Sequence, residues 1–146
     1  MASNINLRII IIVLAFLNVS YIGIEVIKNN IRVPFLTVGE LPQAIYFKLD
    51  RLNLVTSFLE FYIAGCLICG ILFVVYQQRG NIKLFIGGIV AILVVLIIAS
   101  FLVSMFFNAP FGNIMQQFLN QIAILILFGF YVLLAPIFKK KTVFES

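Results

Sequence analysis

The sequence contains no histidine and no tryptophan, and only 10% of its 146 residues are charged. Without histidine, the chain lacks the commonest general base and metal ligand. About a quarter of the residues in a soluble domain are charged, so this low content argues against a soluble protein. The sequence also contains no phosphate-binding loop and no Ser/His/Asp set. We therefore expect no enzyme activity, no metal and no cofactor.

Apolar residues are abundant instead: they make up 64% of the chain, and the mean hydropathy is +1.21. One core of this size cannot bury so much apolar surface, so the remainder has to face lipid or partner proteins within lipid. Four stretches have the roughly 20 mostly apolar residues that one crossing of the hydrocarbon requires. They run from about 9 to 27, 54 to 76, 84 to 107 and 118 to 138.

Each stretch is predicted to be a continuous helix, because lipid offers no partner to a free backbone N–H or C=O. The predicted fold is an all-α integral membrane protein, in which residues 1–146 form one domain of four transmembrane helices in an antiparallel bundle. The first stretch begins like a signal peptide, with Arg8 before a short apolar run. No small-residue cleavage site follows that run, so we expect the first helix to be retained.

The predicted connections differ in length. The second, 77–83, is a tight turn, whereas the first, 28–52, is a long extramembrane loop. Two arms of this first loop, 31–38 and 43–50, flank the turn-forming residues 39–42. This pattern is compatible with a short β-hairpin, and a surface-lying helix over the second arm is the alternative.

The positive charges indicate topology and not a nucleic-acid surface, because they lie at the edges of the apolar stretches. The side with the termini and the second loop carries six, and the other side carries four: Arg8, Arg79, Lys83, Lys139, Lys140 and Lys141 against Lys28, Arg32, Lys48 and Arg51. This excess predicts that both termini are cytoplasmic. The run Lys139–Lys141 is also expected to anchor the last helix as a plain stop-transfer signal, with attraction to anionic lipid as the alternative.

Polar residues within the stretches concentrate at one depth. They lie in the half nearer the first loop and the third loop, about 108–117, and we call this the outer half. Several share a helix face and are expected to turn toward the bundle axis, because unpaired polar groups are costly in hydrocarbon. The predicted cluster consists of Asn18, Tyr21, Glu25, Asn53, Ser57, Glu60, Asn120 and Gln121.

Glu60 is the most informative member, because a carboxylate at membrane depth is rare and often functional. We expect it to be protonated, to pair with Arg51 or Lys48, or to accept hydrogen bonds from Asn120 and Gln121. Such a cluster either binds a small molecule, lipid headgroup or cation, or joins the helices by interhelical hydrogen bonds. Glu25 is expected to be a solvated helix end.

The segment Cys66-Leu67-Ile68-Cys69 matches the C-x-x-C spacing of redox and metal sites. Quinone-coupled disulfide oxidoreductases are also four-helix membrane proteins, but their reactive pair lies near an aqueous face and is resolved by a second pair that this chain lacks. We therefore interpret the cysteines as small residues that let helices approach closely. The predicted helix-packing positions are Gly65, Cys66, Cys69, Gly70, Gly87 and Ala91.

The layout resembles the broad tetraspan class that includes claudin-like and MARVEL-type proteins. The claudin signature requires Trp and paired Cys in the first loop, and residues 28–52 contain neither. No functional residue is therefore carried over. The sequence favours a structural or interaction subunit of a membrane assembly, with membrane lipids and either other membrane-protein subunits or further copies of this chain as partners. A small-molecule, lipid or cation binder or transporter that uses Glu60 is the alternative.

Overall fold

The computed structural model of the chain describes residues 2–35, 41–77, 82–107 and 111–143; for 2–5, 77, 111–112 and 132–143 it describes the backbone alone. The described residues form helices and no strand. The elements in chain order are α1 (Ala2–Arg32), the 3-10 turn η1 (Val33–Phe35), α2 (Gln43–Gln77), α3 (Ile82–Phe107) and α4 (Phe111–Val143).

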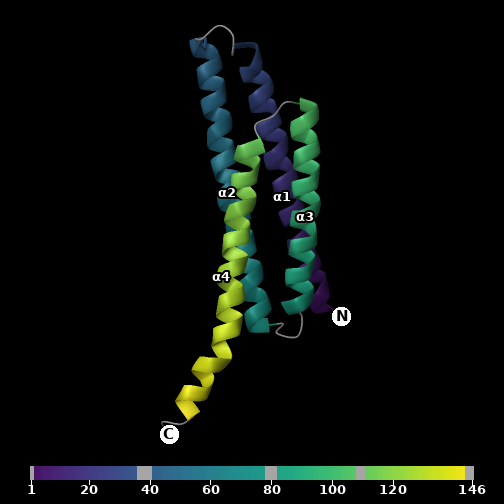
Figure 1. The fold of residues 1–146 in the computed structure, drawn as a ribbon, viewed down its shortest axis with the longest axis vertical. Helices are drawn as coiled ribbons and strands as arrows, with labels where there is room; N and C mark the ends of the chain where they lie inside the picture. The colour runs from purple at the N-terminus through teal and green to yellow at the C-terminus, as the bar shows by residue number, and fades with distance from the viewer. Residues whose placement is uncertain (1, 36–40, 78–81, 108–110, 144–146) are drawn as a thin grey trace.

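In Figure 1, α1 and α3 rise along the long axis of the molecule, whereas α2 and α4 descend. Within the described part of the chain, four helical segments are each long and apolar enough to cross a membrane. They are Asn6–Phe35, Gln43–Tyr76, Ile82–Phe107 and Asn113–Tyr131. This confirms the prediction that the described part of the chain is all-helical and contains four helices suited to cross a membrane.

Each predicted stretch lies inside a longer helix. The largest extension is at the start of α2, which begins at Gln43, and the end of α1 continues to Arg32. In Figure 1 these two parts extend beyond the neighbouring ends of α3 and α4. α2 has 35 residues, which corresponds to about 52 Å at 1.5 Å per residue. Since the hydrocarbon is about 30 Å thick, α2 has to continue beyond it.

The described residues of the first loop do not form a β-hairpin, so that prediction is wrong for them. Residues 31–35 are helical, and 43–50 form the first two turns of α2; residues 36–38 of the first arm lie outside the described part. α2 begins where it does because the carbonyl of Pro42 accepts the backbone N–H groups of Ile45 and Tyr46, at 2.9 and 3.0 Å. The second arm is therefore helical, as in the alternative prediction, but it continues directly into α2.

The core lies along the axis between the helices. All the long helices contribute to its apolar part: Leu7, Leu14, Tyr21, Ile22, Ile63, Leu67, Val74, Phe85, Ile89, Leu93, Leu96, Ile114 and Phe118. Only 22–28% of the most apolar window of each candidate span is buried within the chain. Most of the apolar surface therefore faces outward, as expected for helices surrounded by lipid.

Two predicted features fall at the edges of the described part. Lys139–Lys141 belong to α4, but their side chains lie outside the described residues, and so does most of the predicted turn at 77–83. The lipid-anchoring role of the three lysines stays a prediction. α4 begins at Phe111 and not near Phe118, so most of the residues between α3 and the predicted fourth stretch are helical.

Candidate functional site

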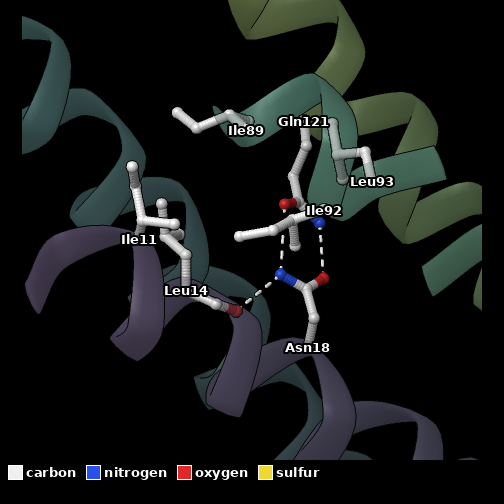
Figure 2. A pocket seen from close by; sticks show the side chains of 7 residues that line it. All are labelled: Ile11, Leu14, Asn18, Ile89, Ile92, Leu93 and Gln121. Atoms are coloured by element: carbon white, nitrogen blue, oxygen red, sulfur yellow. Dashed lines mark hydrogen bonds between the residues drawn. The ribbon is translucent and has the colours of Figure 1, made fainter. Parts of the chain in front are cut away.

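A reciprocal amide pair joins α1 to α4 in the outer half. Asn18 Nδ2 donates to Gln121 Oε1 at 3.2 Å, and Gln121 Nε2 donates to Asn18 Oδ1 at 2.7 Å, as Figure 2 shows. Asn18 Nδ2 also donates to the Leu14 carbonyl at 2.8 Å. Both side chains are buried. Each amide therefore satisfies the other where water is excluded, which is how interhelical amides stabilise membrane helices.

The cavity beside this pair is very small. Its volume is about 10 Å³, and it is lined by Ile11, Leu14, Asn18, Ile89, Ile92, Leu93 and Gln121 (Figure 2). One water molecule requires roughly 10–15 Å³ of such space. The two amides are thus enclosed by aliphatic side chains of α1 and α3, and the space next to them suits a single water molecule at most.

A second contact joins α1, α2 and α4 around the phenol of Tyr21. The hydroxyl donates to Glu60 Oε1 at 3.0 Å, and it lies 3.5 Å from the Asn113 carbonyl oxygen. Tyr21 is buried, whereas Glu60 is half-buried. Glu60 therefore meets a phenol and not the predicted partners: Lys48 and Arg51 are exposed on the extension of α2.

A buried ion pair lies one turn further along α1. Lys28 Nζ contacts Glu25 Oε1, and Asn113 Nδ2 donates to the other carboxylate oxygen, Oε2, at 3.4 Å. Glu25 is only 2% exposed. The prediction that Glu25 is a solvated helix end is therefore wrong, because α1 continues to Arg32 and α4 covers this carboxylate.

The structure brings together five of the eight predicted cluster residues and leaves three outside. Asn18, Tyr21, Glu25, Glu60 and Gln121 form the contacts described above, whereas Asn53, Ser57 and Asn120 are exposed. Sequence reasoning omitted Lys28 and Asn113 from this cluster, whereas it placed the buried Gln117 on one helix face with Asn120 and Gln121. The spacing did contain a signal for Lys28, since it follows Glu25 by three residues.

Among the predicted packing positions, Gly70 is the one in tightest contact. A Cβ atom there would lie 2.8 Å from Phe85 Cζ and 3.1 Å from Ile10 Cγ2, so α1, α2 and α3 converge on this glycine. Gly65 and Gly87 have no atom within 4 Å of such a Cβ, and Cys69 and Ala91 are exposed. The outward positions therefore do not mediate contacts between the described helices.

The two cysteines are both free thiols with different surroundings. Cys66 is partly buried and packs against the core, whereas Cys69 is exposed on the outside of α2. Within the described residues, no group of three or more His, Cys, Asp or Glu side chains is arranged to hold a metal ion.

Comparisons with protein-family models, with curated proteins and with solved structures find no match for this chain. The fold alone therefore indicates which class of protein this is. The chain is an all-helical protein whose described part contains four helices suited to cross a membrane.

Proposed function

We propose that this chain is a multi-pass integral membrane protein with a structural or interaction role and no catalytic activity. Its helices form an antiparallel bundle in the membrane, and the polar residues of the outer half hold that bundle together. The observation that carries this proposal is the reciprocal Asn18–Gln121 pair, because each amide donates a hydrogen bond to the other and accepts one from it. The neighbouring Tyr21–Glu60 bond supports it as a second direct link between helices.

The orientation follows from charge. With the beginning of α1 and the end of α4 at the same end of the molecule (Figure 1), the excess of Lys and Arg on that side favours a cytoplasmic location for both termini. The outer half, with the Glu25–Lys28 pair, then lies toward the opposite aqueous face.

The proposed role is tested by purifying the full chain from its native membrane in a mild detergent, followed by mass spectrometry. A stoichiometric membrane-protein partner, or a defined oligomer of the chain itself, is the expected result. A chain that elutes as a monomer with no partner in several detergents and in lipid nanodiscs would contradict it. The double variant Asn18→Ala, Gln121→Ala removes the amide pair, and it is expected to lower both folding yield and partner recovery.

One observation favours the alternative function, a binder or transporter of a cation or small molecule. Glu60 is half-buried, and it accepts a hydrogen bond from the Tyr21 hydroxyl, which lies 3.5 Å from the Asn113 carbonyl oxygen. Carboxylate and carbonyl oxygens are ligands that suit a hard cation. Glu60→Gln keeps the shape and the hydrogen bond but removes the charge. Normal folding and assembly of this variant with lost ion or ligand binding would favour the alternative, whereas unchanged behaviour in every assay would exclude it.

A further inference from the structure

The face of α4 that points away from the core carries a regular stripe of residues. Its members are all exposed and follow one another at alternating intervals of four and three: Gln116, Asn120, Ala123, Leu127 and Phe130. This is the spacing of the contact positions in a left-handed coiled coil, so the five side chains line one seam of the helix. We call this set the α4 stripe.

The two amides of the α4 stripe lie at membrane depth. Both are inside the candidate span Asn113–Tyr131, and they lie about 7.5 and 13.5 Å along the axis from the first residue of α4 at 1.5 Å per residue. Gln117 and Gln121, one residue further along, are buried in the bundle, whereas Gln116 and Asn120 are exposed. In hydrocarbon an exposed amide has no water to bond with, so the stripe requires a polar partner at the same depth.

We propose that this partner is a second copy of the chain, and that two α4 helices pack in parallel along the α4 stripe. Copies inserted in the same orientation and related by a two-fold axis along the membrane normal place each stripe residue opposite itself. Gln116 and Asn120 suit this arrangement because an amide both donates and accepts hydrogen bonds, so it complements an identical amide at equal depth. The inference rests on the proposed interaction role and names the partner.

The remaining stripe residues fit the same contact. Ala123 is small enough for two helix backbones to approach closely just below the amides, and Leu127 and Phe130 are exposed apolar side chains that pack toward the other leaflet. A lipid acyl chain provides no hydrogen-bond donor or acceptor for Asn120. A second α4 stripe provides both, together with a matching apolar segment.

Two other outward surfaces have small residues at helical spacing, Gly65/Cys69 on α2 and Gly87/Ala91 on α3. They contain no amide that needs a partner. They are therefore the natural controls, because a general tendency of exposed helices to associate would act through them as readily as through the α4 stripe.

The first test is cysteine cross-linking of the full chain in lipid bilayers, in a Cys66→Ser, Cys69→Ser background. Ala123→Cys and Asn120→Cys are expected to form intermolecular disulfides on oxidation. Leu119→Cys and Ile126→Cys are the matched controls, since both positions are exposed on α4 but lie off the stripe. Equal cross-linking at all four positions, or at the two controls alone, would overturn the proposal.

The second test measures the dimer by fluorescence energy transfer between labelled copies while the protein-to-lipid ratio is lowered. The double variant Gln116→Leu, Asn120→Leu is expected to weaken dimerisation at least tenfold, whereas Gly65→Leu and Gly87→Leu change it less than twofold. Circular dichroism checks that each variant keeps its helix content. A monomeric wild-type chain, or loss of the dimer in the glycine variants alone, would overturn the proposal. A stoichiometric partner of a different sequence recovered with that monomer would leave the proposed interaction role intact.

Discussion

At the scale of single residues, specific hydrogen bonds between polar side chains organise the outer half. Asn18 and Gln121 exchange two hydrogen bonds, and the Tyr21 hydroxyl of α1 donates to Glu60 of α2. These residues come from parts of the chain that are separated by 103 and 39 positions. Their pairing therefore fixes the rotation of α1 relative to both α4 and α2.

The amide pair predicts a measurable coupling. Asn18→Ala and Gln121→Ala are each expected to destabilise the fold, because each leaves the other amide without its partner. A double-mutant cycle should give a coupling of about 0.6–2 kcal/mol, as for other interhelical hydrogen bonds in membranes. The free energies come from unfolding in mixed micelles followed by circular dichroism. Asn53→Ala, which removes an exposed amide, is the control, and strictly additive single-variant effects would contradict the pairing.

The Glu25–Lys28 pair predicts a larger and asymmetric effect. Lys28→Met leaves the buried Glu25 carboxylate without its cation, and removal of one member of a buried ion pair costs about 3 kcal/mol or more. The double variant Glu25→Gln, Lys28→Met should recover most of that stability, because the uncompensated charge is gone. Lys48→Met, at an exposed position, should unfold like the wild type. A double variant as unstable as Lys28→Met would show that charge is not the cause.

At the scale of the helices, α2 meets its neighbours most closely at Gly70. Gly70→Ala should destabilise the fold by about 1–3 kcal/mol, because the new methyl group would displace Phe85 and Ile10 in a packed core. Gly65→Ala is the matched control on the same helix, where a Cβ meets no atom within 4 Å, and no loss of stability is expected. The same unfolding assay compares the two. Because Gly→Ala by itself raises helix propensity, equal losses at both glycines would contradict the close contact assigned to Gly70.

The helices themselves could be predicted from the sequence, whereas their ends and rotations could not. Hydropathy finds the crossings, because it depends only on composition within a window. It underestimates α1 and α2, whose polar ends remain helical after they leave the apolar region. Lys28 belongs to such an end. Its spacing from Glu25 indicates the pair, but the burial of the pair depends on α4, which no local pattern reveals.

Helix rotation explains why the structure brings only part of the predicted cluster together. Successive residues on a helix differ by about 100°, so neighbouring amides point to different partners. Gln121 faces Asn18, whereas Asn120 faces outward, and the sequence treats the two alike. Glu60 contacts Tyr21, and this partner depends on how α1 and α2 pack. A single sequence therefore does not reveal how the helices are rotated and aligned relative to one another.

At the scale of the whole molecule, the helices combine two kinds of surface. The apolar exterior is far larger than the core, as shown by the small buried fraction of each candidate span. The interior of the outer half is polar and filled by direct contacts between side chains, and the cavity next to Asn18 is close to the volume of one water molecule. This combination supports the proposed structural or interaction role, because the polar groups already serve the contacts between helices.

The four crossings with cytoplasmic termini are tested most directly by labelling single cysteines with a membrane-impermeant maleimide in intact cells, in the Cys66→Ser, Cys69→Ser background. Lys48→Cys is expected to react from outside, whereas Arg79→Cys and Lys140→Cys should react only after the membrane is permeabilised. Ile98→Cys, in the middle of the third candidate span, should stay unlabelled in both conditions. Reaction of Lys48→Cys and Arg79→Cys from the same side, or ready labelling of Ile98→Cys, would contradict the proposed membrane topology.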